Sequence, residues 1–492
     1  MAATTAESFR KRIEASRRME LKLIIEQARD AGTELVKRVQ AFLDDPLASL
    51  PDGFEPETGE AIFISGSYKN LDAATRFFKE KNPNVYARNG SPAASTLFES
   101  IITYLDPDAV AGAVIGHGMG AISTVTLGLI ANGKLKPGDK IVISNDIFAG
   151  CRKIFDQLKS SAAIEIQAVD GADLDEWEDA VTEDTKLVFI ETPGNPCGTL
   201  VDVDRWHEIV RSQGHPNVLT VADLSLEYLA HTKEFSLLKR GVDIVVASLT
   251  KSLGLGADPG GILYMSQEGC DRLRDLPRHE IRVADYTQGS VTVHYEEIPE
   301  TEPNVNILVR HIAQHGHTLA PRVAFELLKN LLFLEPRYDR QSANAKILAN
   351  HIHDLRDRYP DIRVLSPYLP DHRQADLAKR QMKGGMVFSV NLRSYEHART
   401  FVDTLAACDV KLINNFGSPG TTISHPAGTT HATLTEPQRR EQGIGPGIVR
   451  ISVGVEDIKL LLKIFNHALS TTFPKAATAR RPFAANIRAL AS

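Results

Sequence analysis

The chain has 492 residues, of which 42% are hydrophobic and 24% are charged, with 34 glycines and 25 prolines. These values are typical of a globular protein and exclude disordered and collagen-like chains; the length allows about three domains of roughly 150 residues, or one large α/β domain with smaller attachments. With 56 basic against 62 acidic residues and a formal charge of -6, the composition does not favour a nucleic-acid or anionic-membrane partner, so we expect a small-molecule partner.

The cysteines and the apolar runs predict where the protein is located. The four cysteines, at positions 151, 197, 270 and 408, show no CxxC spacing, which is typical of free thiols in a reducing compartment. The first residues lack the apolar centre of a signal peptide, and no apolar run of about 18 residues occurs. We therefore expect a cytoplasmic protein that does not span a membrane.

The N-terminal region predicts a helical arm. Apolar residues recur at helical spacing between residues 7 and 43, which indicates one charged amphipathic helix or a helix pair. The Pro/Gly/acidic stretch DDPLASLPDGFEPETGE that follows is typical of a linker. We expect an appended arm that packs on the rest of the chain or contacts another subunit. Arm, linker and a subunit-contact segment are assigned together to residues 1–95.

Residues 96–320 predict a large α/β domain. Helix-length stretches separate most of its short apolar runs, a pattern that favours a mostly parallel, seven-stranded sheet with helices on both faces. The predicted strands are 109–115, 141–144, 163–169, 186–191, 217–223, 242–248 and 261–265. Beyond about residue 320 a helical region is followed by VFSVNL and GIVRISVGVE. This change predicts a smaller C-terminal α+β domain over residues 321–492.

A lysine follows one of the predicted strands at the edge where ligands collect in parallel sheets. Lys251 lies three residues beyond Ser248, with Thr250 beside it and the run LGLGADPGG close behind. A lysine that is shielded from water has a lowered pKa, and its neutral amine can form a Schiff base with an aldehyde. The alternative is a lysine that extends to solvent at the sheet edge. The two hydroxyls and the glycine run favour the functional interpretation.

The segment AGAVIGHGMGAISTVTLGLI predicts a strand, a glycine turn and a helix whose first turn presents backbone N–H groups to a phosphate. The glycines at 116–120 also resemble part of a dinucleotide motif, although the third glycine is misplaced for G-x-G-x-x-G. A nicotinamide-dependent dehydrogenase is therefore kept as an alternative. A phosphate-binding helix start, two hydroxyls and an imine-forming lysine together describe pyridoxal 5'-phosphate as the cofactor.

Two further charged residues fit this cofactor chemistry. Asp223 ends the predicted strand 217–223, where a carboxylate can keep the pyridine nitrogen protonated, so that the ring accepts electrons. The alternative role is a helix cap. Arg450 lies within a strand-like run, where an arginine without an anion would be costly. A substrate carboxylate would satisfy it, and a structural ion pair is the alternative.

With these residues in place, the chain resembles the Cys/Met-metabolism family of pyridoxal-phosphate enzymes, which includes cystathionine γ-synthase, cystathionine γ-lyase, methionine γ-lyase and O-acetylhomoserine sulfhydrylase. The resemblance covers about residues 80 to 460. It implies the α/β architecture called PLP fold type I. The matching segments are VDIVVASLTKSLGLGADPGG, FIETPGNPCGTLVDVD, KLKPGDKIVISNDIFAGC, AKRQM, ISHPAGTTH and GIVRISVGVED.

The resemblance implies a role for each matching residue. Lys251 would be the Schiff-base lysine and proton shuttle, and Asp223 would contact the pyridine nitrogen. Arg450 would bind the substrate α-carboxylate, with Asn415 also near the substrate. The other expected cofactor-binding residues are Tyr86, Arg88, Gly118, Met119, Phe148, Asn195, Ser225, Ser248 and Thr250.

The resemblance also implies an oligomer. Tyr86 and Arg88 match a Tyr-x-Arg pair that reaches the phosphate of a neighbouring subunit, so we expect a homo-oligomer, a tetramer built from dimers with shared active sites. No metal is expected, because the histidines in HIAQHGHTLAP match the family's loop before the C-terminal domain better than a ligand set.

The departures from the family pattern concern substrate choice. The common Tyr-Gly-Gly is Phe148-Ala149-Gly150 here, Asp-Asn-Thr is Asp223-Leu224-Ser225, and Ser-Leu-Gly-x-x-Glu is the hexapeptide from Asn415 to Gly420. Without the phenol at 148, a leaving group that departs without a proton is favoured, or Lys251 handles the proton transfers. An insertion between residues 261 and 316 either gates the site or extends a subunit contact.

The expected activity is γ-elimination or γ-replacement on a γ-substituted L-amino acid, through ketimine and vinylglycine-type intermediates. The leaving group would be acetate, phosphate, a thiol or a halide. A β-eliminating C–S lyase is the nearest alternative. An NAD-dependent dehydrogenase and a catalytically silent oligomeric scaffold are the alternatives from other classes.

Overall fold

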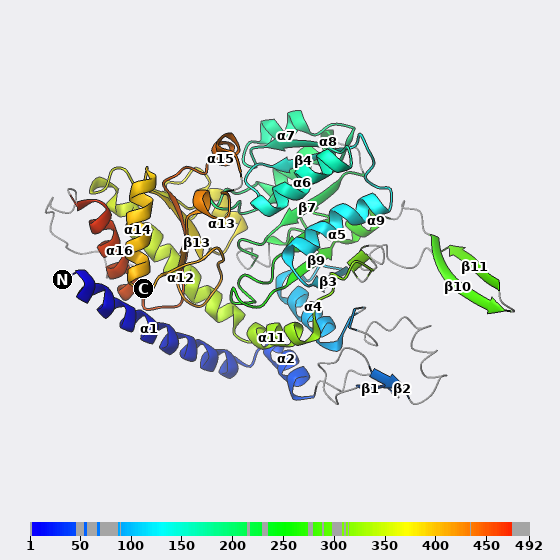
Figure 1. Cartoon of the computed structure of the whole chain (residues 1–492), viewed down its shortest axis with the longest axis horizontal. Helices are drawn as coiled ribbons and strands as arrows, with labels where there is room; N and C mark the ends of the chain where they lie inside the picture. Colours follow the sequence, from blue (N-terminus) through cyan, green and yellow to red (C-terminus); the bar gives the residue numbers. More distant parts are fainter. Residues whose placement is uncertain are drawn as a thin grey trace.

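The computed structural model contains two β-sheets with their covering helices, and a long N-terminal helix that runs along one side (Figure 1). It describes residues 2–45, 54–56, 66–68, 87–88, 90–213, 217–228, 235–273, 279–287, 290–297, 308, 311–312, 314–432 and 434–474. The larger sheet is built from residues 111–265 and the smaller one from residues 363–452. The domain limits at 95/96 and 320/321 stay predictions.

The larger sheet has seven strands in the order β3-β9-β8-β7-β6-β4-β5. Only β9 runs antiparallel to its neighbours, so the mostly parallel seven-stranded sheet is confirmed. Each predicted strand agrees with the observed one to within two residues at either end. The bounds are β3 (Ala111–Ile115), β4 (Lys140–Ser144), β5 (Glu165–Val169), β6 (Thr185–Glu191), β7 (Leu219–Asp223), β8 (Ile244–Ala247) and β9 (Gly261–Met265).

The strands of this sheet are apolar on both faces because helices cover both. Alternate residues of β4 enter different cores: Val142 joins the cluster that contains Trp177 and Trp206, whereas Ile143 joins the cluster that contains Phe155. This explains why the strands appear as continuous apolar runs in the sequence. The accompanying helices are α4 (Pro92–Leu105), α5 (Gly118–Ala131), α6 (Ala149–Ser161), α7 (Leu174–Ala180), α8 (Val203–Gln213), α9 (Gln267–Arg272) and α11 (Pro321–Leu331).

The smaller sheet has five strands in the order β12-β13-β16-β15-β14 and is mixed. The predicted C-terminal strand segments are β13 and β16, which pair at the centre of the sheet. The strands are β12 (Arg363–Leu365), β13 (Val387–Asn391), β14 (Lys411–Leu412), β15 (Thr422–Ser424) and β16 (Ile448–Ser452). Its helices are α12 (Leu334–Asp354), η3 (Leu355–Asp357), α13 (Ala375–Gln381), α14 (Tyr395–Ala407), η4 (Pro426–Gly428), α15 (Glu436–Glu441) and α16 (Ile458–Thr472).

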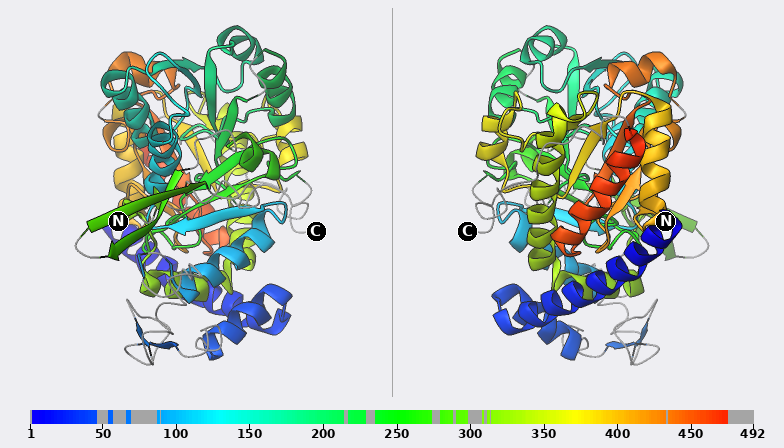
Figure 2. Two further views of the ribbon diagram at one scale, coloured as in Figure 1. Left: turned by 90° about the vertical axis from the view of Figure 1, so that its right-hand side faces the viewer. Right: turned by 90° about the vertical axis from the view of Figure 1, so that its left-hand side faces the viewer.

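The N-terminal region forms a helix pair. The long helix α1 (Ala2–Ala31) contacts α12, α14 and α16, and α2 (Glu34–Asp44) contacts α4 and α11 (Figure 2). The insertion contains a two-stranded antiparallel sheet of β10 (His279–Thr287) and β11 (Ser290–Glu297). Another such pair is β1 (Phe54–Pro56) with β2 (Gly66–Tyr68). Among the described residues, every helix is too short or too polar to cross a bilayer.

The interior strand β6 offers a test of the larger sheet. Phe189 is 2% exposed and packs edge-on against Phe155, with ring centroids 5.2 Å apart. We predict that Phe189→Ala lowers the free energy of unfolding by about 3 to 5 kcal/mol, because it leaves a cavity in a close-packed core. Chemical denaturation followed by circular dichroism measures this. Leu412→Ala, at a side chain that is 48% exposed, is the control and should change it by less than about 0.5 kcal/mol. Equal effects of the two changes would contradict the assigned core.

Candidate functional site

The carboxyl ends of three neighbouring parallel strands meet at one edge of the larger sheet. Glu191 of β6 is paired in register with Asp223 of β7, and Asp223 is paired in register with Val246 of β8. The chain leaves β8 at Ala247, and Lys251 follows in the next turn. Residues that are 28 to 60 positions apart in the sequence are therefore brought to one place.

The side chain of Lys251 is held by a segment from the smaller sheet's side of the molecule. Its Nζ donates a hydrogen bond of 2.7 Å to Asn415 Oδ1 and lies 4.7 Å from the ring centroid of Phe416. Asn415 Nδ2 in turn donates to the carbonyl of Gly256 at 2.8 Å. The amide of Asn415 is thus oriented with its oxygen toward the lysine.

Burial lowers the pKa of Lys251 from 10.5 to about 8. The positive charge of Arg450 acts in the same direction, and the carboxylates of Asp223 and Glu191 act against it. A pKa near 8 leaves about one tenth of the amine neutral at pH 7, which is several hundred times the fraction of an ordinary lysine. Lys251 is therefore suited to act as a nucleophile and as a proton carrier near neutral pH.

Two buried carboxyl groups lie beside the lysine. Asp223 accepts a 2.8 Å hydrogen bond from the backbone N–H of Ser225, and the thiol of Cys151 donates to it at 3.9 Å. Glu191 accepts a 2.7 Å hydrogen bond from the backbone N–H of Phe148. Burial raises the pKa of both carboxyls, and their mutual repulsion raises that of Glu191 further. The register of β6 and β7 makes this proximity unavoidable.

Arg450 projects from β16 into the same site. Its Nη1 donates to Asn195 Oδ1 at 3.0 Å, and its Cζ lies 4.8 Å from the Phe416 ring centroid. Arg450 is 3% exposed, and its Nη2 is buried without a hydrogen-bond partner among the described residues. Burial lowers its pKa to about 10, so it stays charged at neutral pH. Within the described residues it forms no ion pair with a carboxylate, which argues against the structural alternative.

The N-terminus of α5 adjoins the turn that carries Lys251. A Cβ added at Gly118 would lie 2.6 Å from the Cβ of Ser248, so only glycine fits there without a shift. Met119 follows in the first turn of α5. The hydroxyl of Thr250 is bonded to Gly260, whose N–H donates to it at 3.0 Å and whose carbonyl accepts from it at 3.2 Å. Ser248 thus lies at the helix start, whereas the Thr250 hydroxyl is engaged elsewhere.

The remaining predicted residues fall in different places. Phe148 is the N-cap of α6, and Ser225 Oγ accepts a 2.8 Å hydrogen bond from the N–H of Ser248. The backbone carbonyl of Arg88 accepts a hydrogen bond from the Thr318 hydroxyl. Tyr86 lies outside the described residues.

Two residues that the sequence analysis did not assign support the site. Phe416 is 3% exposed and contacts both cations. Arg337 of α12 is fully buried and donates to the backbone carbonyls of Gly417, at 3.0 Å, and of Ser252. Because Ser252 follows Lys251 and Gly417 follows Phe416, Arg337 joins the two segments that meet at the lysine. Phe416 was signalled only by its position next to Asn415, and nothing in the sequence singled out Arg337.

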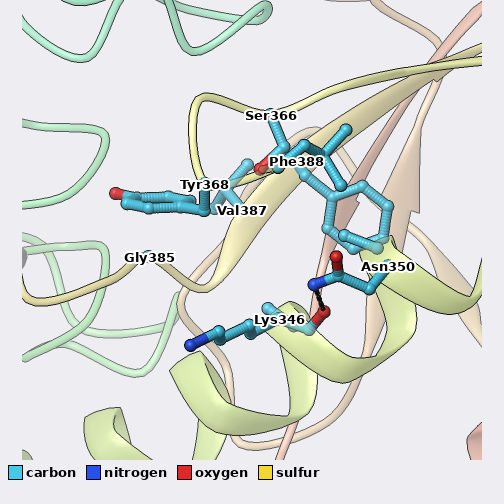
Figure 3. Close-up of a pocket in the computed structure, with 10 residues that line it drawn as sticks. Lys346, Asn350, Ser366, Tyr368, Gly385, Val387 and Phe388 are labelled. Carbon is cyan, nitrogen blue, oxygen red and sulfur yellow. Dashed lines mark hydrogen bonds between the residues drawn. The ribbon is translucent and has the colours of Figure 1, made fainter. Parts of the chain in front are cut away.

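Two other features lie outside this site. The rings of His311 and His315 stack with centroids 3.8 Å apart, but no group of three or more His, Cys, Asp or Glu side chains is arranged to hold a metal in the part of the chain that the structure describes. A small hollow between α12 and the strand β13 is drawn in Figure 3, with Lys346 and Asn350 on the helix side and Phe388 on the strand side. None of the predicted site residues lines it.

The electrostatics of Lys251 lead to a direct test. Competitive labelling of the cofactor-free protein with acetic anhydride, read by mass spectrometry between pH 6 and 10, should give half-maximal reactivity of Lys251 near pH 8. We predict that Arg450→Met moves this midpoint to higher pH, because removing a neighbouring positive charge stabilises the ammonium form. Arg18→Met, at an exposed side chain on α1, is the control. A midpoint that stays in place or falls in Arg450→Met would contradict the assigned coupling.

Comparisons with known proteins identify the family to which the chain belongs. Residues 51–470 match the family model described as Cys/Met metabolism PLP-dependent enzyme. The chain is 32% identical over 432 residues to an O-succinylhomoserine sulfhydrylase of Mycobacterium tuberculosis, an alignment that covers 86% of this chain and 93% of the relative. It is 30% identical over 407 residues to an L-methionine gamma-lyase of Fusobacterium nucleatum, which covers 82% and 89%.

A solved structure shows the same architecture. The crystal structure of cystathionine gamma synthase from Xanthomonas oryzae pv. oryzae in complex with cystathionine superposes with a TM-score of 0.69 at 26% identity, covering 89% of this chain and 98% of that one. The expected PLP fold type I is thereby confirmed. The chain belongs to the Cys/Met metabolism PLP-dependent enzyme family, and its cofactor is pyridoxal 5'-phosphate.

Proposed function

We propose that the protein catalyses γ-elimination or γ-replacement on a γ-substituted L-amino acid whose leaving group departs as an anion. The observation that carries the proposal is the position of the Lys251 amine, held by Asn415 and Phe416 on the same ring that Arg450 contacts, with Nη2 of Arg450 buried and without a partner among the described residues. The relatives named above as sulfhydrylase and γ-lyase support reaction at Cγ.

The residues present fit the cofactor. A Cβ at Gly118 would collide with Ser248, so the start of α5 keeps its backbone N–H groups open next to a hydroxyl, as phosphate binding requires. Asp223 is buried, and its donors are the backbone and side chain of Ser225 and the weakly donating thiol of Cys151. A protonated ring nitrogen would offset more of the cost of its burial. When bound, pyridoxal 5'-phosphate supplies an aldehyde for the substrate amine and a ring that accepts electrons from Cα.

The protein's own groups do the positioning and the proton transfers. Arg450 binds the α-carboxylate through its free Nη2, while Asn195 keeps the guanidinium in place through Nη1. Lys251 Nζ removes the proton from Cα and returns protons along the substrate, and its pKa near 8 serves both directions. Asn415 Oδ1 orients the amine by accepting one of its hydrogens. Phe416 excludes water beside both cations.

The residue at position 148 restricts the leaving group. Phe148 offers a ring face but no hydroxyl where the family commonly has tyrosine, so it cannot give a proton to a departing group. Carboxylates such as succinate or acetate, and phosphate, leave without one. A thiolate would draw its proton from Lys251. O-acyl and O-phospho homoserines are therefore the preferred substrate class.

A substrate panel tests the reaction. The loaded enzyme should release a 2-oxo acid and ammonia from O-succinyl-, O-acetyl- or O-phospho-L-homoserine, or form a thiol amino acid from it when sulfide is added. We predict that Lys251→Ala lowers this turnover by about 10³-fold or more, because it removes the proton carrier. Lys379→Ala, at a lysine whose side chain is 73% exposed, is the control. Turnover of β-substituted amino acids alone would identify a β-eliminating C–S lyase instead, and no turnover of any amino acid would overturn the proposal.

The role assigned to position 148 has a separate test. We predict that Phe148→Tyr changes turnover of O-succinyl-L-homoserine by less than about threefold but raises that of L-methionine by about tenfold, since proton transfer to a leaving group contributes about 10² to 10⁴-fold when fully effective. Steady-state kinetics on the two substrates measure the ratio. A large gain on O-succinyl-L-homoserine would show that its leaving group does need the phenol.

A further inference from the structure

The N-terminal helix α1 contributes to the hydrophobic core beside the smaller sheet and does not only cover its surface. Ile13 is fully buried in the apolar core that contains Phe401 and Phe465 of α14 and α16. Polar contacts fix the helix along its length: Ser16 Oγ accepts a 2.7 Å hydrogen bond from the N–H of Asp457, and Glu20 pairs with Arg340 at 3.0 Å. Figures 1 and 2 show α1 lying against α12 and α16. Its side chains are therefore held in a fixed register.

Arg17, between these anchors, reaches a buried carboxylate. Its Nε donates to Glu456 Oε1 at 3.2 Å, and Glu456 is fully buried. The same carboxylate accepts hydrogen bonds from the N–H and the hydroxyl of Thr421, at 2.8 and 2.9 Å. The Thr421 hydroxyl also accepts a 2.9 Å bond from the N–H of Gly454. One carboxylate thus connects α1 to the residue at the end of the segment that carries Asn415.

Arg17 fills the space that the missing side chain of Gly420 leaves open. A Cβ added at Gly420 would lie 2.2 Å from Arg17 Nε, so the guanidinium occupies the place of a side chain at position 420. The family pattern that the chain resembles has a glutamate there. Glycine at 420 and arginine at 17 are therefore complementary, and any larger residue at 420 would displace the guanidinium.

The segment from Asn415 to Thr421 is short and is held at most of its residues. Gln341 Nε2 donates to the Ser418 carbonyl at 2.9 Å, Arg337 donates to the Gly417 carbonyl, and the Val455 N–H donates to the Pro419 carbonyl at 2.8 Å. Arg17 completes this set of contacts through Glu456 and Thr421. Losing one of them loosens the segment that carries Asn415 and Phe416, which contact Lys251.

We propose that Arg17 is a positioning residue, which acts through Glu456 and Thr421 to fix the segment 415–421 over Lys251 and Arg450. This inference rests on the proposed function for its kinetic consequence. Loosening the segment weakens the enclosure of the Arg450 guanidinium by Phe416, so it should weaken substrate binding more than it slows the chemistry. The N-terminal helix is then part of the substrate site although it makes no contact with Lys251.

Hydrogen exchange on the full-length protein tests the structural half. In Arg17→Ala, the amide of Thr421 should exchange at least tenfold faster than in the wild type, with and without pyridoxal 5'-phosphate, because its acceptor Glu456 loses the bond that fixes it. The amide of Gly417, which donates to Ser452 Oγ, should also exchange faster, because the whole segment is loosened. Arg18→Ala removes the same charge from an exposed position on α1 and should leave exchange unchanged. Arg17→Lys keeps the charge but not the planar fork and should fall between them.

Kinetics on O-succinyl-L-homoserine test the functional half. In Arg17→Ala we expect KM to rise about tenfold while kcat falls by less than about threefold, with partial recovery in Arg17→Lys. Gly420→Ala, which crowds the guanidinium from the other side, should give the same split. Unchanged exchange at 417 and 421 in both variants, or equal effects of Arg18→Ala, would overturn the inference. Because exchange needs no substrate, the absence of turnover on the whole panel would count against the proposed function alone.

Discussion

Two basic side chains are buried against one aromatic ring in this protein, and the rest of the site follows from that constraint. Lys251 and Arg450 contact the same ring of Phe416, and each has its pKa lowered, mainly by burial. A buried lysine can avoid the free-energy cost of a desolvated charge by losing a proton, whereas a guanidinium stays charged at neutral pH. Burial, with a smaller contribution from the arginine's charge, therefore keeps the lysine partly neutral. The arginine is itself left with an unsatisfied Nη2 that an anionic group can take.

The site is assembled from two sheets, so its precision depends on what joins them. Lys251 and Asp223 come from the edge of the larger sheet, whereas Arg450 comes from the smaller one. Arg337 links the two parts, because its guanidinium donates hydrogen bonds to the carbonyl of Ser252, which follows Lys251, and to the carbonyl of Gly417, which follows Phe416. All the acceptors of Arg337 named here are neutral: two backbone carbonyls and the amide oxygen of Gln341. These hydrogen bonds fix the backbone without adding a negative charge near Lys251 and Arg450.

The sequence predicted the parts of the site that depend on local order. Apolar runs marked the strands, and the rule that ligands collect at strand ends picked out Asp223 and Lys251. Arg450 stood out because a lone arginine in a buried strand needs an anion. Contacts that depend on long-range packing left no such signal: nothing in the spacing of the chain says that Arg17 meets Glu456, 439 residues away, or that Phe416 lies between two cations.

The N-terminal helical arm shows the same limit. Its periodicity predicted a helix and an amphipathic face, but a face does not say which surface it covers. Only the structure shows that Ile13 on this face packs into the core beside the smaller sheet. Physical interpretation of a sequence therefore reaches secondary structure and strand-end chemistry, and it stops where the partner of an apolar or charged side chain is chosen by tertiary contacts.

The balance of charge in the pocket shows why Glu191 matters although it was not among the assigned residues. The register of β6 and β7 sets Glu191 beside Asp223, and two ionised carboxyls there would repel each other in a poorly solvated place. Burial and the neighbouring Asp223 raise the pKa of Glu191, so this carboxyl holds its proton more tightly than an exposed glutamate does. The less negative charge Glu191 carries, the less it offsets the positive charges of Lys251 and Arg450. Under the proposed function, this strengthens the attraction of Arg450 for the substrate carboxylate.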